Sequence, residues 1–319
     1  MKTILVTGGC GFIGSHFINY IHKTYPTYHV INIDKLDYCS SETNVHQREK
    51  DYTFYHLDLT NKDKLLNIFM VHDVDIVVHF AAQSHVDNSF GNSIQFTFDD
   101  VLGTHVLMEC IRITHQRRPL EKIVHISTDE VYGEVANDHS GCHENSLLDP
   151  TNPYAASKAG AEFVVRSYYH SFKLPIVITR GNNVFGENQY PEKLIPKFIH
   201  QLLKGEKMTI QGRGTSRRNF IYVEDVCSAV DCIMTKGEIH QIYNIGSTDE
   251  YSVMEIAHIL LGLLKPNENI QDWIQYIPDR YFNDQRYSIN CDALHALGWK
   301  KQVSFEEGLA HVIDFWKFK

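Results

Sequence analysis

Short apolar runs alternate with amphipathic stretches through the first 180 residues of the chain. The runs are apolar at consecutive positions, which is typical of parallel strands that are covered on both faces. We expect strands at 3–7, 29–34, 53–56, 75–80, 122–127 and 175–180. Apolar residues recur at helical spacing between them, which predicts helices at 12–25, 62–71, 94–114 and 154–172. This alternation predicts a doubly wound α/β fold around a parallel sheet.

The pattern changes beyond about residue 180, where Pro, Gly and Asn interrupt shorter apolar segments. We therefore expect two parts, a first domain over residues 1–180 and a smaller C-terminal lobe over 181–319. Some of the later chain is expected to return to the first domain. Ligands of doubly wound folds bind at the carboxyl ends of the strands. We expect the C-terminal lobe to bind the substrate.

The composition is that of a globular protein, because 43% of the 319 residues are hydrophobic and 22% are charged. A net charge of −9 and the absence of a dense basic run argue against nucleic acid as a partner. No apolar run has the length of a membrane span, and no signal peptide is evident, so we expect a cytoplasmic protein without a membrane partner. The 7 cysteines and 19 histidines show neither CxxC nor HExxH spacing, and no metal site is expected.

A glycine-rich turn follows the first expected strand. Gly8, Gly11 and Gly14 are spaced as GxxGxxG at the start of the first helix. Glycines let a pyrophosphate approach the backbone there, and the helix N-terminus attracts it. Phe12 and Ile13 lie in the same turn and are expected to contact the same ligand. The arrangement is typical of a Rossmann-type fold that binds a dinucleotide.

Residues at the ends of the next strands extend this cofactor site. Asp34 ends the second strand, 20 residues after Gly14, where a carboxylate binds both ribose hydroxyls and repels a 2′-phosphate. NAD is therefore favoured over NADP, although the neighbouring Lys35, which is also expected at the cofactor, is positively charged. Further contacts are expected after the third and fourth strands, at Asp58, Leu59, Ala81, Ala82 and Gln83. An alternative for Asp58 is that it caps the helix that begins near Asn61.

Tyr154 and Lys158 are one helical turn apart in the sequence Tyr-Ala-Ala-Ser-Lys, so they share one face of an expected helix. A nearby ammonium, together with the positive nicotinamide of a bound NAD, favours the phenolate form of the tyrosine. A phenolate can remove a hydroxyl proton while hydride leaves for NAD. The glycine turn and the Tyr-x-x-x-Lys pair together resemble the extended short-chain dehydrogenase/reductase family.

Two adjacent carboxyl groups, Asp129 and Glu130, follow the strand expected at 122–127. A reductase or a 4-epimerase needs only a hydroxyl here to assist the tyrosine, and Ser127 or Thr128 would suffice. An elimination needs a base beside a carbonyl and an acid for the departing hydroxyl. The pair therefore favours a dehydratase, and the alternative is a solvated turn with two acids.

The surrounding segments resemble the nucleotide-sugar 4,6-dehydratases, the family that acts on dTDP-glucose or UDP-glucose. Matching segments run through nearly the whole chain, at 79–87, 127–133, 180–186, 191–196, 218–225, 243–246 and 279–287. By this resemblance, Thr128 hydrogen-bonds the sugar O4, Asp129 is the acid for the C6 hydroxyl, and Glu130 is the C5 base. Tyr154 is then the O4 base, and Lys158 supports it.

The resemblance also implies the remaining contacts and the reaction. Asn183 is expected at the cofactor, and the expected substrate contacts are Ser84, Thr128, Asn182, Lys193, Leu194, Arg218, Asn283 and Arg286. The implied enzyme is an NAD-dependent lyase that oxidises C4, eliminates water across C5 and C6, and returns hydride to C6. Such a product leads towards rhamnose and other 6-deoxy sugars. The apolar content of the helices at 94–114 and 154–172 predicts a homodimer, as in family members that pair through a helix bundle.

Some positions depart from the family pattern. Asp99 and Asp100 stand where Asn or Thr is usual, and Gln211 stands where many bacterial members have an aromatic residue near the nucleotide base. The choice between dTDP and UDP stays open. A 4-epimerase or decarboxylase on the same scaffold is the nearest alternative enzyme, and a catalytically silent NAD sensor is the alternative from another class.

Overall fold

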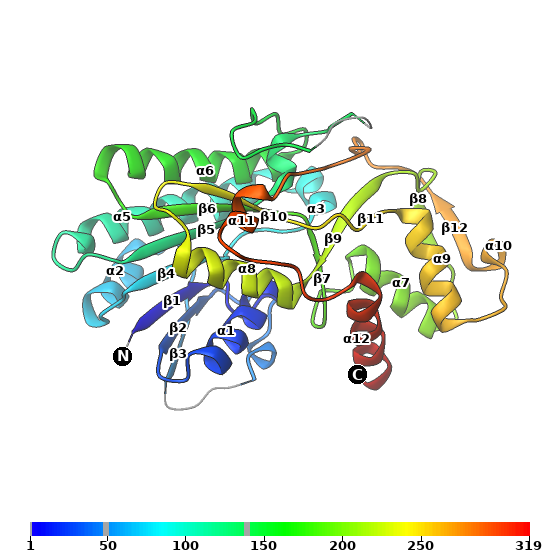
Figure 1. Ribbon diagram of the computed structural model, residues 1–319, viewed down its shortest axis with the longest axis horizontal. Helices are drawn as coiled ribbons and strands as arrows, with labels where there is room; N and C mark the ends of the chain where they lie inside the picture. Colours follow the sequence, from blue (N-terminus) through cyan, green and yellow to red (C-terminus); the bar gives the residue numbers. More distant parts are fainter. Residues whose placement is uncertain (1, 47–50, 137–140) are drawn as a thin grey trace.

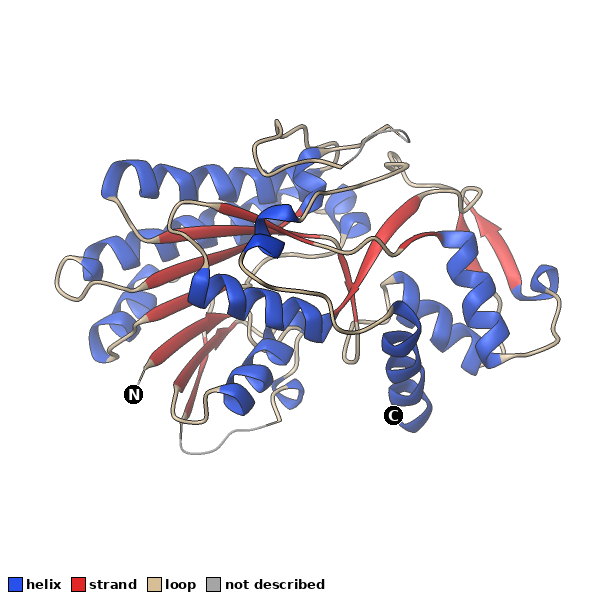
Figure 2. Ribbon diagram, viewed as in Figure 1, coloured by secondary structure: helices blue, strands red, loops and turns tan. Residues whose placement is uncertain are grey.

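A seven-stranded parallel sheet organises the first part of the chain (Figures 1 and 2). The computed structural model describes residues 2–46, 51–136 and 141–319. The strand order is β10-β6-β5-β4-β1-β2-β3, which is the Rossmann order with one further strand. The strands are β1 (Thr3–Thr7), β2 (His29–Asp34), β3 (Tyr52–His56), β4 (Ile76–His79), β5 (Lys122–Thr128), β6 (Ile176–Gly181) and β10 (Ile242–Ile245). The expected doubly wound α/β fold is confirmed.

Alternate side chains of each strand enter two separate cores, because successive residues point to opposite faces of a sheet. Ile4 and Val6 pack on one face, whereas Leu5 packs on the other. The first face is covered by α1 (Phe12–Thr24) and α8 (Val223–Lys236), and the second by α2 (Lys62–Val71), α5 (Gly103–His115) and α6 (Pro153–Phe172). Both faces are covered, which explains why the strands are apolar at nearly every position.

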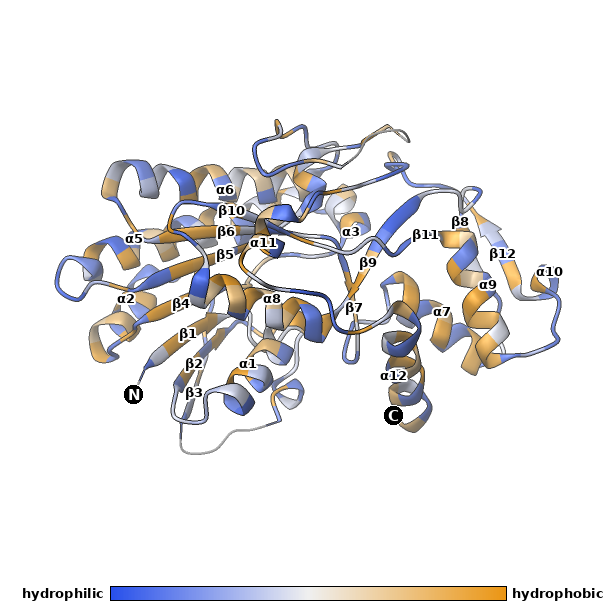
Figure 3. Cartoon of the chain, in the orientation of Figure 1, coloured by the Kyte–Doolittle hydropathy of each residue, from blue (hydrophilic) through white to orange (hydrophobic). Residues whose placement is uncertain are grey.

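Elements from beyond residue 180 pair with this sheet or pack on its helices. β10 pairs with β6 at the edge of the sheet, α8 packs against α1, and α11 (Asp292–Ala296) lies against β10. The rest of this part of the chain forms the second lobe, on the right in Figure 1. Its strands are β7 (Asn183–Phe185), β8 (Met208–Gln211), β9 (Arg217–Tyr222), β11 (Glu250–Ser252) and β12 (Ile274–Ile277), and its helices are α7 (Leu194–Leu203), α9 (Val253–Leu264), α10 (Ile270–Trp273) and α12 (Phe305–Phe318). α9 is mostly hydrophobic (Figure 3) and packs on α7.

The helix expected over 94–114 is interrupted in the structure. α4 (Ser93–Phe96) leads into a π-helical segment, η2 (Thr97–Leu102), and only then into α5. The carboxylate of Asp100 in η2 is buried and accepts hydrogen bonds from the backbone N–H of Gln83 at 2.7 Å and the hydroxyl of Ser157 at 2.6 Å. Such wider turns often occur at functional sites. The spacing of hydrophobic residues did not predict this π-helical segment. The segment occurs together with tertiary contacts of Asp100, which the spacing does not record.

The remaining short helical segments are η1 (Glu42–Asn44), α3 (Val86–Gly91) and η3 (Asp129–Tyr132). Among the described residues, none of the helices combines the length and hydrophobicity that a membrane span requires.

Candidate active site

A cleft of about 320 Å³ lies at the carboxyl ends of the central strands. It is lined by all the residues expected at the cofactor: Gly8, Gly11, Phe12, Ile13, Gly14, Asp34, Lys35, Asp58, Leu59, Ala81, Ala82, Gln83 and Asn183. It is also lined by the five residues expected in catalysis, Thr128, Asp129, Glu130, Tyr154 and Lys158, and by Ser84, Asn182 and Lys193 of the expected substrate contacts. One cavity therefore joins segments that are far apart in the sequence.

The glycine turn packs so closely against neighbouring backbone that side chains would not fit at Gly8 and Gly14. Gly8 has φ +69°, and a Cβ at this position would lie 2.6 Å from the backbone nitrogen of Ala81. A Cβ at Gly14 would lie 2.3 Å from the carbonyl oxygen of Gly8. Gly11 precedes α1, and no described side chain caps the helix there. The first N–H groups of α1 are therefore available to an anion, which fits the pyrophosphate of a dinucleotide.

Asp34 is fixed at the end of β2 by its neighbours. Its Oδ2 accepts from the backbone N–H of Cys10 at 2.9 Å, and its Oδ1 accepts from the backbone N–H of Leu36 at 2.8 Å. These bonds hold a largely buried carboxylate at the wall of the cleft, which fits a role in binding ribose hydroxyls.

Asp58 makes a local turn at the end of β3. Its Oδ1 accepts from the backbone N–H and the hydroxyl of Thr60, at 2.8 and 2.7 Å. Asn61 caps α2 instead, because its side chain accepts from the backbone N–H of Lys64 at 3.2 Å. The alternative that Asp58 caps this helix is therefore wrong.

The start of α6 sets the positions of the tyrosine and the lysine. The side chain of Asn152 accepts from the backbone N–H of Ala155 at 2.9 Å, and a proline occupies the first helical position. This cap begins the helix one residue before Tyr154, so Tyr154 lies in its first turn and Lys158 in the next. The Nζ of Lys158 donates to the carbonyl oxygen of Ile126 at 2.7 Å.

The protonation of Tyr154 differs from what Lys158 alone predicts. Burial raises the pKa of the phenol well above its usual value, and the negative charges of Glu130 and Asp100 raise it further. A hydrogen bond with Thr128 opposes this rise. Burial also lowers the pKa of Lys158. Burial and these carboxylates thus oppose the phenolate form. The phenolate was expected from Lys158 and the positive nicotinamide together, and that expectation stays a prediction.

Asp129 and Glu130 form an acidic pair at the end of β5, in which Asp129 is buried and Glu130 is half-buried. Asp129 is 2% exposed, and its Oδ2 accepts from the side chain of Asn182 at 2.7 Å. Burial, and next the charge of Glu130, raise the pKa of Asp129 to about 7. Burial also raises the pKa of Glu130, whose Oε2 accepts from the side chain of Asn152 at 3.2 Å. The alternative of a solvated turn is therefore wrong.

Four expected substrate contacts are not among the residues that line the cleft: Leu194, Arg218, Asn283 and Arg286. Arg286 is held by Glu250, whose Oε1 accepts from its Nε at 2.6 Å. The guanidinium of Arg218 lies 4.5 Å from the ring centroid of Tyr287. The Tyr287 hydroxyl donates to Asp284 at 2.5 Å and also lies 3.4 Å from the Oε2 of Glu130. Arg218 therefore lies beside the acidic pair without lining the cleft.

The sequence did not indicate two residues that support this site, Asn152 and Tyr287, and it marked Asp100 only as a departure from the family pattern. The Asn-Pro dipeptide before a helix signals a cap, but the second bond of Asn152, to Glu130, depends on the tertiary fold. Tyr287 approaches from the C-terminal lobe, and no local pattern marks that approach.

The parallel sheet, the glycine turn and the Tyr–Lys pair in one cleft define an extended short-chain dehydrogenase/reductase. Within that class, the chain belongs to the GDP-mannose 4,6-dehydratase family, whose family model matches residues 5–312.

Similar proteins include dehydratases named for dTDP-glucose and dehydratases named for UDP-glucose. The dTDP-D-glucose 4,6-dehydratase of Dictyostelium discoideum is 44% identical, covering 99% of this chain and 82% of the relative. A trifunctional UDP-glucose 4,6-dehydratase, 3,5-epimerase and reductase of Arabidopsis thaliana is also 44% identical, over 99% of this chain. The chain spans about half the length of this plant relative, 47%.

Two solved structures show how widely the fold is shared. DesIV, a dTDP-glucose 4,6-dehydratase of Streptomyces venezuelae with NAD and TYD bound, has a TM-score of 0.93 and 36% identity, covering 100% of this chain and 98% of that one. A UDP-glucose 4-epimerase of Thermotoga maritima with UDP-glucose has a TM-score of 0.90 and 27% identity, covering 99% of both chains.

Proposed function

We propose that the protein is an NAD-dependent 4,6-dehydratase that converts dTDP-glucose or UDP-glucose to the 4-keto-6-deoxy sugar nucleotide. The observation that carries the proposal is the acidic pair Asp129–Glu130, which lines the same cleft as Tyr154. The family and the named dehydratase relatives support this activity. The similarity to an epimerase supports the scaffold alone, and epimerisation at C4 needs no base for C5.

The residues of the cleft divide between cofactor and sugar nucleotide. Gly8, Gly11 and Gly14 with the start of α1 would hold the pyrophosphate of NAD, and Asp34 its ribose. When bound, NAD supplies a hydride acceptor that is restored within each turnover. Residues 1–180, with the returning β10 and α8, form the cofactor domain, and residues 181–319 supply the sugar-nucleotide lobe. The proposed substrate contacts are Ser84, Thr128, Asn182, Lys193, Leu194, Arg218, Asn283 and Arg286, of which the two arginines suit a diphosphate.

The chain's own residues move the protons of the reaction. Tyr154 takes the proton of the C4 hydroxyl as C4 loses a hydride to the acceptor that NAD would supply, with Lys158 one turn along α6. The resulting ketone acidifies the C5 proton, which Glu130 removes. Asp129 gives its proton to the C6 hydroxyl, which leaves as water. Glu130 then returns a proton to C5 as C6 receives the hydride that C4 lost. The proton taken by Tyr154 passes through solvent to restore Asp129, so one water is lost overall.

Glu130→Gln tests this assignment, because it keeps the size of the side chain and removes the proton acceptor. Oxidation at C4 uses Tyr154 and survives, while elimination slows by about 10² to 10⁴-fold. The variant should accumulate nicotinamide absorbance after addition of dTDP-glucose or UDP-glucose, with little solvent deuterium at C5. Tyr154→Phe is the control and should give no such absorbance. Normal turnover by Glu130→Gln would contradict the dehydratase assignment, and wild-type turnover with the two sugars identifies the nucleotide.

The proposal extends to the assembly and its location. Ile94 (71% exposed) and Phe98 (51%) lie at the start of the interrupted helix, and Phe163 (57%) and Phe172 (48%) lie on α6. Apolar side chains exposed on two helices that pack together favour a second copy of this chain as the partner, in a homodimer. A cytoplasmic location suits an enzyme of sugar-nucleotide metabolism, and cell fractionation tests it.

A further inference from the structure

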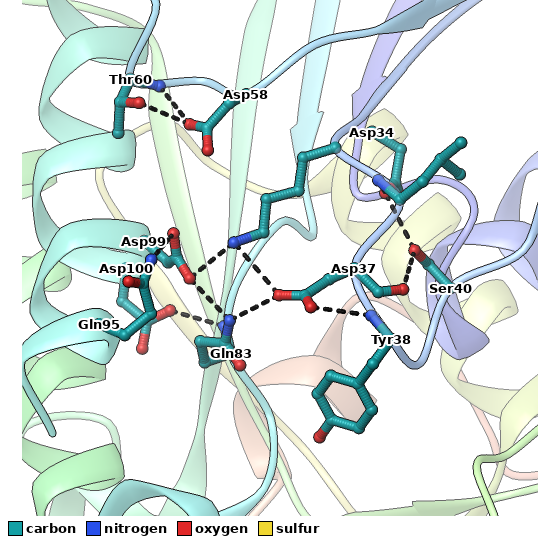
Figure 4. A network of polar contacts seen from close by, with 12 residues as sticks. Asp34, Asp37, Tyr38, Ser40, Asp58, Thr60, Gln83, Gln95, Asp99 and Asp100 are labelled. Carbon is teal, nitrogen blue, oxygen red and sulfur yellow. Dashed lines mark hydrogen bonds and ion pairs between the residues drawn. The ribbon is translucent and has the colours of Figure 1, made fainter. Parts of the chain in front are cut away.

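A network of polar side chains crosses the cofactor end of the cleft (Figure 4). Asp99, in the π-helical segment η2, is 8% exposed at its side chain. Its Oδ2 accepts from the Nζ of Lys35 at 2.7 Å and from the Nε2 of Gln83 at 2.6 Å. Its Oδ1 accepts from the Nε2 of Gln95 at 3.0 Å. The carboxylate is therefore fixed from three sides, and one of its partners is the lysine that follows Asp34.

A second carboxylate holds the same ammonium. The Oδ2 of Asp37 lies 3.2 Å from the Nζ of Lys35 and accepts from the Nε2 of Gln83 at 2.9 Å. Burial lowers the pKa of Lys35, but the hydrogen bond and charge of Asp99, with those of Asp37, outweigh it and raise the pKa. Lys35 is therefore a charged group whose ammonium is already paired with two carboxylates.

Lys35, Asp37 and Gln83 also line a second cavity, of about 740 Å³, together with Gln95. Asp99 lines the cofactor cleft. The ion pair between Lys35 and Asp99 thus forms part of the wall between the two cavities. If the Lys35 side chain moved away from this wall, it would lose its ion pairs with Asp37 and Asp99.

The electrostatics of this wall discriminate between the two nicotinamide dinucleotides. Near the Lys35–Asp99 bridge, the wall of the cofactor cleft carries the carboxylates of Asp34, Asp37, Asp58 and Asp99 (Figure 4). A 2′-phosphate on the adenosine ribose would enter a negative field, and the neighbouring cation is already paired. A ribose with free hydroxyls meets no such repulsion, because a carboxylate accepts its hydrogen bonds.

We propose that Asp99 is a specificity-determining residue: by holding Lys35 across the cleft, it withholds the cation that a 2′-phosphate would need, and so excludes NADP. The inference rests on the proposed use of NAD. It assigns a role to one of the two acidic positions at which this chain departs from the Asn or Thr usual in its family.

The test is the ratio of the dissociation constants for NAD and NADP, measured by calorimetric titration of the full chain without sugar. Asp99→Asn keeps the size of the side chain but removes the charge that holds Lys35. The ratio should shift towards NADP by about tenfold or more, the range of one charge-assisted contact. Asp37→Asn removes the second partner and should shift the ratio in the same direction, which provides an independent test if Asp99→Asn does not fold.

Two controls separate the release of Lys35 from a general loss of negative charge. Asp58→Asn removes one charge from the same wall, but its carboxylate bonds Thr60 rather than Lys35, so its shift should be smaller. Adding Lys35→Gln to Asp99→Asn should abolish the shift. An unchanged ratio in both single variants, an equal shift in Asp58→Asn, or a shift that persists without Lys35 would overturn the proposal. Wild-type chain that fails to bind NAD would instead contradict the proposed function.

Discussion

At the scale of single residues, Asp129 shows how burial prepares a carboxyl group to act as an acid. Its ordinary pKa of 3.8 would leave it ionised throughout the neutral range, whereas burial and Glu130 raise the pKa to about 7. An acid donates only when protonated, so the protonated fraction, and the rate of elimination, should fall as the pH rises through about 7.

Asp129→Asn removes this proton and keeps an oxygen that can accept from Asn182. Elimination should slow by about 10² to 10⁴-fold and lose its decline above pH 7. Single-turnover release of the 4-keto-6-deoxy product, followed from pH 6 to pH 9, measures both effects. A variant with the wild-type pH profile would exclude Asp129 as the acid.

Residues whose chemistry depends on local spacing were predictable, and residues that depend on tertiary contacts were not. Gly8, Asp34 and the Tyr154–Lys158 pair are marked by their distance from strand and helix ends, and the cleft contains all of them. The raised pKa of Tyr154 was not predictable, because it arises from burial and from charges on other segments.

At the scale of elements, the strands were predicted closely because their burial on both faces gives nearly continuous apolar runs. The π-helical segment η2 was not predicted. Apolar residues lie about four positions apart in a π-helical turn as in an α-helix, so their spacing does not distinguish the two. Its position depends on a buried carboxylate, that of Asp100, and this dependence gives a measurable effect of pH on stability.

Burial raises the pKa of Asp100 from 3.8 to about 6. A carboxyl group whose folded pKa lies above its unfolded value loses stability as pH rises through that interval, because the unfolded state releases its proton first. Between about pH 4 and 6 this loss amounts to as much as about 3 kcal/mol, and it stays constant above that interval. Asp100→Asn removes the titration, so its free energy of unfolding should rise relative to wild type from pH 4 to pH 6. Urea unfolding at several pH values measures this difference, and parallel stability curves would contradict it.

At the scale of the whole molecule, the later chain completes the sheet and also supports the site. Asn244 of β10 accepts from the hydroxyl of Tyr132 at 2.8 Å. The same hydroxyl accepts from Arg180 at 2.8 Å, and Arg180 is paired with Glu162 of α6 in the interior. A segment from beyond residue 180 is thereby linked to the segment that carries Asp129, so the two parts of the chain are not independent. This network was not predictable from the sequence, because its members are far apart in the chain and meet only in the tertiary fold.

The proposed dimer is a property of the whole molecule and depends on apolar side chains exposed at its surface. Phe163 on α6 is 57% exposed, so Phe163→Glu should leave the fold intact while placing a charge in an apolar contact between two copies. Leu263→Glu is a matched control, because Leu263 is 56% exposed but lies on α9 of the second lobe. At micromolar concentration, sedimentation velocity should show a dimer for wild type and for Leu263→Glu, and a monomer for Phe163→Glu. The Phe163→Glu variant should be monomeric because an unpaired carboxylate buried in an apolar interface is strongly unfavourable. A monomeric wild-type chain, or a Phe163→Glu variant that remains dimeric, would place the partner surface elsewhere.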